Sequence, residues 1–91
     1  MKIVLNRAYG GFSLPEDFRE QFNINEYDEY DINRTDERLI NFIENHGGEV
    51  EVRFGILEII EIPDNSTDWE ISEYDGFEEV IYVIDGKIHH E

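Results

Sequence analysis

The sequence predicts a single small α+β domain over residues 1–91, in which two helices pack on one face of a mostly antiparallel sheet of about four strands. Two observations predict this class. Apolar residues have helical spacing in much of the first half of the chain and alternate with polar residues in most of the second half. The length of 91 residues fits one domain with a modest core. The chain has no cysteine, so disulfides and thiolate metal sites are excluded.

The first element is a strand at residues 2–6, whose apolar and β-branched residues face both sides and indicate an internal position in the sheet. Gly10-Gly11 then predicts a tight turn. Ser13 is the expected cap of a short helix that ends near Asn23. The apolar stripe of this helix consists of Leu14, Phe18 and Phe22.

Residues 23–34 have no helical stripe and are expected to form an exposed loop or edge segment. A second helix is predicted at about residues 36–46, capped by Thr35 or Asp36 and stopped by Gly47. Its expected buried side consists of Leu39, Ile40, Phe42 and Ile43.

The second half of the chain predicts strands. Residues 49–62 alternate in polarity, and a phase change near Gly55 and Leu57 suggests a bulge in one long strand. Strands at 69–74 and 77–84 are joined by Asp75-Gly76, a dipeptide suited to a hairpin turn with positive φ. Residues 85–91 are left as a short tail.

The chain is strongly acidic. It contains 7 Lys and Arg against 23 Asp and Glu, a formal net charge of −16, and every acidic residue lies from Glu16 onward. Because 40% of the residues are hydrophobic and regularly spaced, this composition favours a folded domain with an acidic coat over disorder. The charge attracts basic surfaces and repels nucleic acid, so direct nucleic-acid binding is not expected. No apolar stretch approaches the roughly 20 residues of a membrane span, and we expect a cytoplasmic protein without membrane contact.

Several segments together resemble one protein family. The segments are Lys2-Ile3-Val4-Leu5-Asn6-Arg7, Tyr9-Gly10-Gly11-Phe12-Ser13-Leu14, Arg34-Thr35-Asp36 with Leu39-Ile40, Glu61-Ile62-Pro63-Asp64, Trp69-Glu70-Ile71 and Glu73-Tyr74-Asp75-Gly76. In them the chain resembles a widespread family of small proteins from bacteriophages and bacteria that has no assigned activity. The resemblance implies a common fold and a phage or prophage setting, but no reaction. Residues 80–90 depart from the mixed-charge, Trp-containing end of that family.

The acidic surface and the phage setting together suggest an inhibitor that mimics DNA on the basic surface of a host nucleic-acid-binding or defence protein. Carboxylates at alternate strand positions, such as Asp68 and Glu70, lie about 6.6 to 6.8 Å apart on one face. A dense array of them can replace the phosphate charge of a duplex. The alternative is that the acids only keep the domain soluble, although solubility usually needs a net charge of only about 2 to 8.

The candidate partner-binding residues form two groups. They are Glu26, Tyr27, Asp28, Glu29, Tyr30 and Asp31, and then Asp68, Glu70, Glu73, Asp75, Glu78 and Glu79. Tyrosine supplies a large amphipathic contact area at little entropic cost, so Tyr27 and Tyr30 suggest the centre of an interface. The alternative for these two tyrosines is that they cover the core beneath a loop.

A second candidate function is the binding of a small ligand or nucleotide phosphate at the Gly10-Gly11 loop. A strand, a basic residue, glycines and a helix start in succession can direct backbone N–H groups at an anion. The residues concerned are Asn6, Arg7, Gly10, Gly11 and Ser13. The segment matches neither the dinucleotide-binding nor the P-loop pattern.

No metal site, cofactor or catalytic centre is predicted. His89 and His90 are adjacent and would point to opposite faces of a strand. Residues 31–42 have part of the spacing of a calcium loop, but Asp36 stands where glycine is needed. We therefore expect a protein that is not an enzyme, present as a monomer or as a small homo-oligomer paired through an open edge of the 77–84 strand.

Overall fold

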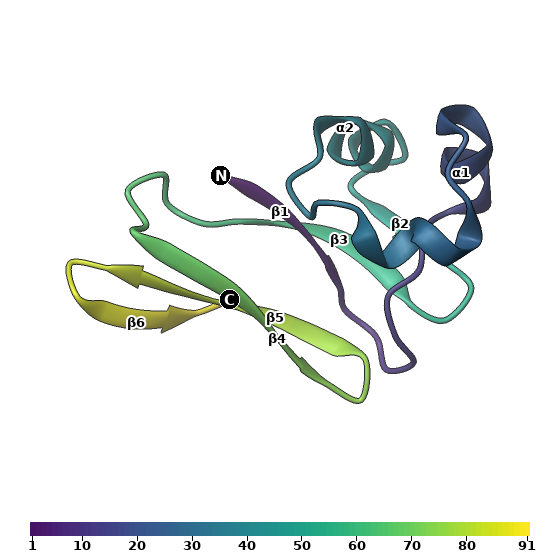
Figure 1. Cartoon of the computed structure of the whole chain (residues 1–91). Helices are drawn as coiled ribbons and strands as arrows, with labels where there is room; N and C mark the ends of the chain where they lie inside the picture. Colours follow the sequence, from purple (N-terminus) through teal and green to yellow (C-terminus); the bar gives the residue numbers. More distant parts are fainter.

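Two three-stranded antiparallel sheets form the framework of the protein, whose computed structural model describes residues 1–91 (Figure 1). The first sheet has the order β1 (Lys2–Asn6), β3 (Ile56–Glu61), β2 (Glu49–Glu51), and the second has the order β4 (Asp68–Tyr74), β5 (Phe77–Ile84), β6 (Lys87–His90). The helices are α1 (Glu16–Phe22), the 3-10 helix η1 (Glu26–Asp31) and α2 (Glu37–Asn45). The α+β class is confirmed, but the prediction of one sheet of about four strands is wrong.

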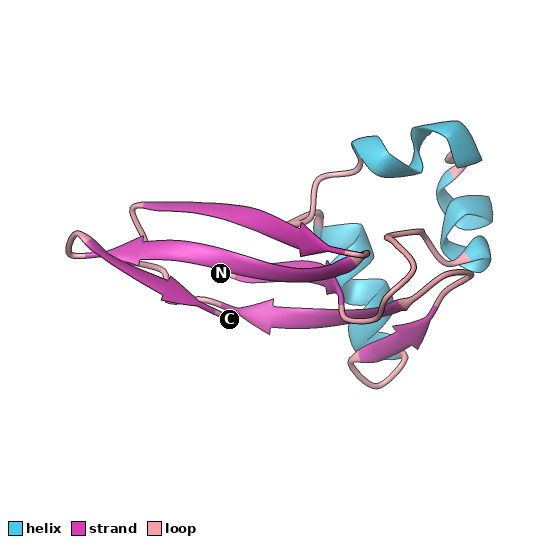
Figure 2. Cartoon of the chain, turned by 90° about the horizontal axis from the view of Figure 1, so that it is seen from below, coloured by secondary structure: helices cyan, strands magenta, loops and turns pink.

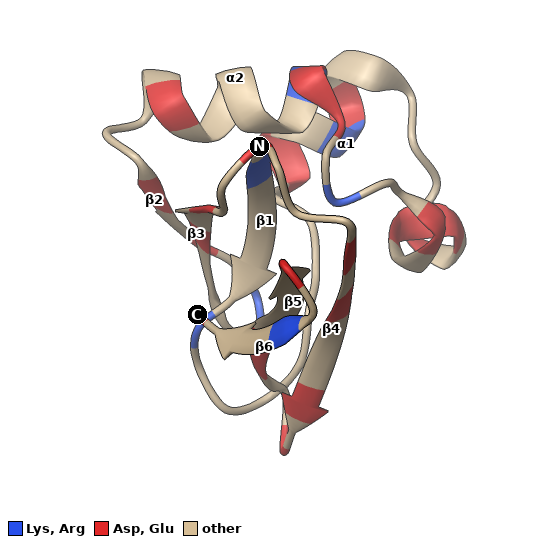
Figure 3. Cartoon of the chain, turned by 90° about the vertical axis from the view of Figure 1, so that its left-hand side faces the viewer, with Lys and Arg blue, Asp and Glu red and all other residues tan.

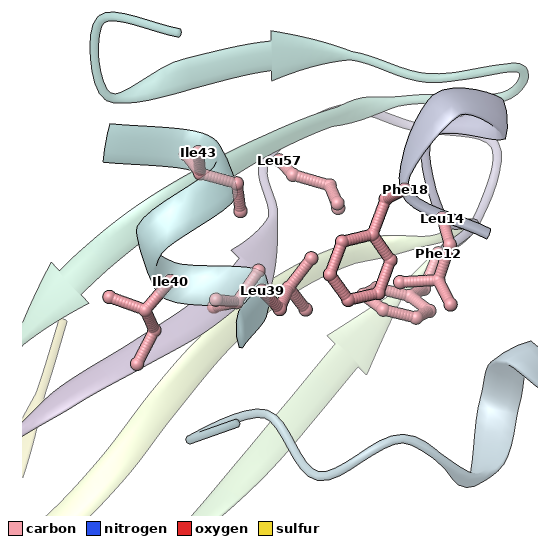
Figure 4. Packing of buried hydrophobic residues seen from close by; sticks show 8 residues of the cluster. Phe12, Leu14, Phe18, Leu39, Ile40, Ile43 and Leu57 are labelled. Atoms are coloured by element: carbon pink, nitrogen blue, oxygen red, sulfur yellow. The ribbon is translucent and has the colours of Figure 1, made fainter. Parts of the chain in front are cut away.

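The helices and sheets stack in three layers. One cluster of buried side chains lies between the helices and the first sheet, and a second cluster lies between the two sheets. The first consists of Val4, Phe12, Leu14, Phe18, Leu39, Ile40, Ile43 and Leu57, most of which Figure 4 shows converging from α1, α2 and the sheet. The second consists of Ile3, Leu5, Ile62, Val80 and Tyr82. The helices therefore cover one face of the first sheet, as predicted, and the second sheet covers the other.

β1 is buried on both faces although it is an outer strand. Val4 faces the helices, whereas Ile3 and Leu5 face the second sheet. The prediction of an internal strand is wrong. Apolar residues on both faces of a strand require that layers cover both faces, but they do not require a neighbouring strand at both edges. Its free edge is closed by Arg34 and Glu78: Val4 N–H donates to Arg34 O at 2.8 Å, and Asn6 N–H donates to Glu78 Oε1 at 2.7 Å.

α1 begins later than expected and lacks the predicted cap. Pro15 is the N-cap residue and no side chain caps the helix, while the Ser13 hydroxyl is buried without a hydrogen-bond partner. The helix ends at Asn23, as predicted, and Asn23 has the left-handed conformation (φ 55°) of a C-cap.

α2 follows the prediction closely. The Asp36 carboxylate accepts a hydrogen bond from Arg38 N–H at 2.8 Å, which satisfies one of the free donors at the start of the helix. Leu39, Ile40 and Ile43 are buried, and the chain leaves the helix before Gly47, whose φ is 91°.

Two segments in the second half differ from the prediction. Residues 49–62 form a hairpin of β2 and β3 instead of the single bulged strand that was predicted. In the turn of this hairpin, Val52 N–H donates to Gly55 O at 2.9 Å. The expected tail at 85–91 forms β6, which pairs with β5 after the turn Asp85-Gly86 (φ 50° and 77°). β5 is consequently the central strand of its sheet and has no open edge, so the predicted association through this strand is wrong.

The helices lie beside one end of the elongated sheet framework (Figure 2). None of them has the length and apolar composition needed to cross a membrane.

Candidate protein-binding surface

Acidic side chains cover several elements of the protein. Figure 3 shows them on α1, η1, α2 and the outer strand β4, among other places. Glu78 is the only acidic residue that is buried. The acids therefore form a broad coat, and any localised site must be distinguished from it by other residues.

The tyrosines of η1 provide such a distinction. The exposed fractions of Tyr27 and Tyr30 are 82% and 66%, so the alternative that they cover the core is wrong. Asn25 Oδ1 accepts a hydrogen bond from Tyr27 N–H at 2.9 Å and fixes the start of the 3-10 helix. The exposed acids Glu26, Asp28 and Asp31 flank the two tyrosines in the sequence of η1, and none of these three is in an ion pair.

Glu29 points away from this surface. Its Oε2 accepts a hydrogen bond from Leu14 N–H at 3.1 Å and lies 3.8 Å from Arg19 Nε. Leu14 directly precedes Pro15, the N-cap residue of α1, so this carboxylate ties η1 to the segment that leads into the first helix. Glu29 positions the tyrosine-bearing segment and offers little of its own charge to a partner.

The second predicted group lies along β4 and its turn. Asp68, Glu70, Glu73 and Asp75 are exposed and none of them is in an ion pair. Glu73 Oε1 accepts a hydrogen bond from Gly76 N–H at 2.8 Å, which supports the turn. Figures 2 and 3 place β4 and η1 along the same side of the molecule.

Glu78 is not part of the surface, contrary to the prediction. It is 5% exposed and forms a bidentate ion pair with Arg34, with N–O distances of 2.6 and 2.8 Å. The Arg34 guanidinium also lies 3.6 Å from the ring centre of Phe12. The sequence analysis named Arg34 only as part of the family resemblance and assigned it no contact. The inward direction of Glu78 could have been found, because Glu78 is in phase with the buried Val80 and Tyr82 on β5.

Glu79, the last residue of the second predicted group, has a histidine neighbour on β6. It is half-buried on the outer face of β5, and its Oε1 lies 3.3 Å from His90 Nδ1 on the neighbouring strand. Its charge is therefore partly balanced when His90 is protonated.

A like-charge pair lies on the first sheet, away from both predicted groups. Glu58 on β3 is directly opposite Glu49 on β2. Partial burial and the neighbouring Glu49 carboxylate raise the pKa of Glu58 above its usual range, although Arg7 acts in the opposite direction. The acidic coat thus contains at least one site of direct repulsion.

Three of the five residues expected to bind an anion at the glycine loop use their hydrogen-bonding groups inside the protein, and the Ser13 hydroxyl is buried. Asn6 is fully buried, and its Nδ2 donates to Ala8 O and Gly76 O at 2.8 and 2.6 Å. Arg7 Nη1 donates to Glu78 O at 2.9 Å, and Gly10 N–H donates to Asp75 O at 2.9 Å. The loop geometry consequently gives no support to the anion site.

The glycines of this loop are explained by close approach of backbones. A Cβ at Gly10 would lie 2.3 Å from Phe54 O, and a Cβ at Gly76 would lie 2.2 Å from Gly11 N. The loop after β1 is therefore packed directly between the β2–β3 turn and the β4–β5 turn.

The largest hollow is an open groove of about 640 Å³ beside α1, α2 and β2. Its charged lining mixes both signs, and no group of three or more His, Cys, Asp or Glu residues is placed to hold a metal ion. The residues lining the groove are Leu14, Pro15, Glu16, Asp17, Arg19, Glu26, Phe42, His46, Val50, Glu51, Val52 and Arg53. No constellation of acid, base and nucleophile distinguishes this groove.

Comparison with known proteins gives no match to a protein-family model, to a curated protein or to a solved structure. The resemblance to the phage and bacterial family stays a prediction.

Proposed function

We propose that the protein is a non-enzymatic binding protein of phage or prophage type, which places its acidic surface on the basic surface of a host nucleic-acid-binding or defence protein. It inhibits that protein by occupying the position of DNA. The proposal rests on the net charge of −16 and on the way in which η1 presents Tyr27 and Tyr30 among unpaired carboxylates.

The exposed tyrosines carry this proposal further than charge alone. A coat that only maintains solubility does not require large aromatic rings in water, whereas the centres of interfaces are enriched in tyrosine. The two rings project from a segment that Asn25 and Glu29 hold in place. Little ordering of the η1 backbone is then needed on binding, which lowers the entropic cost of association.

The charge determines the kind of partner. Duplex DNA has about one negative charge per 1.7 Å of axis, and proteins that bind it present Lys and Arg to the phosphates. η1 and β4 lie along the same side of the molecule, so their exposed acidic residues can contact such a basic surface together. Association of this kind is fast at low salt and weakens as ionic strength rises.

The test is capture of partners from host lysate at low salt, followed by competition. The immobilised protein is expected to retain nucleic-acid-binding proteins that salt elutes. Each captured protein is then bound to a labelled duplex, and the acidic protein is titrated in. Release of the duplex is the expected result, and a ternary complex that keeps the duplex bound contradicts mimicry.

A matched pair of variants localises the contact. One variant has Glu26, Asp28 and Asp31 changed to lysine, and the control has Glu37, Glu51 and Glu61 changed to lysine. Both change the net charge by the same amount, and none of the six residues is in an ion pair. The η1 variant should weaken binding at least tenfold more than the control. Equal losses would mean that the coat acts only through its total charge.

A further inference from the structure

We propose that the outer edge of β4 is a second binding site, which accepts an extended segment of a partner protein in which Lys or Arg residues alternate with apolar residues. The segment would add to the second sheet as a fourth strand. This inference uses the backbone of β4 and does not depend on DNA mimicry at η1.

The backbone of β4 has free hydrogen-bonding groups at this edge. Val80 on β5 exchanges both backbone hydrogen bonds with Glu91, at 3.0 and 2.9 Å. The N–H and C=O of Val80 therefore point toward β6. Ile71 is the residue opposite Val80 on β4, so its own N–H and C=O point away from β5. Hydrogen-bonding directions alternate along an antiparallel strand, so the N–H and C=O of Glu73, two residues further on, also point away from β5.

No other element occupies this edge. β4 is an outer strand of its sheet, and the backbone groups of Ile71 and Glu73 make no hydrogen bond to a loop or side chain. An edge strand with free N–H and C=O groups is a template for pairing with another extended chain. Seven residues, from Asp68 to Tyr74, are long enough for such pairing.

The side chains of β4 select the chemistry of the added strand. Asp68 and Glu70 lie on the outer face, whereas Trp69 and Ile71 lie on the inner face and are half-buried against the second cluster. A strand added beside residues 68–71 would place alternate residues next to Asp68 and Glu70 on the outer face and the residues between them next to Trp69 and Ile71 on the inner face. Further along, Glu73 lies on the inner face, in phase with Trp69 and Ile71. Lysine or arginine alternating with valine or isoleucine satisfies both faces.

The same charges disfavour a second copy of β4 at this edge. In a parallel, in-register pair, Asp68, Glu70 and Glu73 of one copy would lie beside the same acids of the other, and like charges across strands are destabilising. In any register, two chains that each have a net charge of −16 repel one another. The structure therefore favours a basic partner segment over self-association.

The direct test uses a fluorescent, end-blocked peptide, Lys-Val-Lys-Val-Lys-Val-Lys, with the full chain. We expect saturable binding, together with at least tenfold slower hydrogen exchange at the Ile71 and Glu73 amides. The Ser72 amide, which faces β5, should not change. Absence of binding, or binding without this alternation in exchange, overturns the proposal.

Two variants at one position separate the backbone from the charge. Glu73→Ala removes the carboxylate and keeps the N–H, whereas Glu73→Pro removes both. Proline is tolerated where a strand N–H faces solvent, so the fold should persist. Glu73→Pro is expected to bind the peptide at least tenfold more weakly than Glu73→Ala. Equal affinities would show that charge alone holds the peptide.

A modified peptide provides the same test with the unaltered protein. N-methylation of one alternating set of peptide amides blocks hydrogen bonds to β4, and methylation of the other set does not. One methylated peptide should therefore lose binding while the other keeps it. If both bind equally well, or if light scattering shows a dimer that occupies the edge without peptide, the proposal is wrong. Loss of lysate partners in the η1 variant leaves these results unaffected.

Discussion

The two outer strands β1 and β4 end their sheets in opposite ways. The edge of β1 is closed by Arg34 and Glu78, whose backbone carbonyl and carboxylate accept the N–H groups of Val4 and Asn6. The edge of β4 has no such partners. The difference follows from what lies on either side of the strand. Layers cover both faces of β1, so water is excluded there, whereas water reaches the backbone of β4 freely.

Closing an edge with a buried carboxylate makes the fold sensitive to that one group. A buried donor without an acceptor costs about 1 to 3 kcal/mol, and a buried charge without its counter-ion costs more. Glu78 accepts from the backbone of β1 and from Arg34 at the same time. The open edge of β4 contains no comparable residue.

The largest effect is expected from Glu78→Gln. It leaves the Arg34 guanidinium without its counter-charge, and the free energy of unfolding should fall by about 3 to 5 kcal/mol. Glu79→Gln, one residue further along and half-exposed, is the control and should change stability by no more than about 0.5 kcal/mol. Urea unfolding of both variants checks this. Similar losses in the two variants would contradict the role given to Glu78.

A second comparison concerns the two Asp-Gly turns of the second sheet. Gly86→Ala should cost about 1 to 2 kcal/mol, because alanine is strained at positive φ. Gly76→Ala should cost at least about 1 kcal/mol more, because its Cβ would also press on the backbone of Gly10 and Gly11. Thermal or urea unfolding measures the difference. If the two costs are equal, the turn at residue 76 can move away from the first sheet freely.

The smallest effect is expected at the pair Glu49 and Glu58 on the covered sheet. Like charges directly opposite one another are destabilising, so Glu49→Gln should raise stability at pH 7 by about 0.2 to 1 kcal/mol. Glu51→Gln is the matched control, since Glu51 is opposite Ile56 and should give no comparable gain.

The pH dependence of this gain has a definite sign. Burial and Glu49 raise the pKa of Glu58, so the folded state holds its proton more tightly than the unfolded state does. The repulsion is present only above that raised pKa and disappears on acidification. The difference between Glu49→Gln and the unsubstituted chain should therefore vanish near pH 3, and a gain that persists there would contradict the charge argument.

Elements with strong local signals could be predicted from the sequence. α2 has a cap at Asp36, an apolar stripe and a glycine stop, and Asp75-Gly76 specifies its hairpin. The same dipeptide recurs at Asp85-Gly86. The residues after it are exposed and do not alternate between apolar and polar, so β6 could not be predicted from the sequence. The turn from Val52 to Gly55 has no such dipeptide, so β2 and β3 were expected as one strand.

The candidate surface was predictable only in part. The exposure of the acids of η1 follows from composition and from the absence of a helical stripe. Whether Tyr27 and Tyr30 are exposed or cover the core was open from the sequence, and the structure shows that they are exposed. The roles of Glu29 and Glu78 depend on contacts with Leu14 and Arg34, which are 15 and 44 residues away in sequence. Local patterns carry no information about such partners, and charge alone assigned both residues to the surface.

The closure of β1 has a consequence for the order of folding. Asn6 receives its acceptor from a residue 72 positions later, so β1 cannot complete its edge until the chain has been synthesised beyond Glu78. Until then β1 is an aggregation-prone strand with apolar residues on both faces. The high negative charge of the intervening segments would keep such nascent chains apart during that interval.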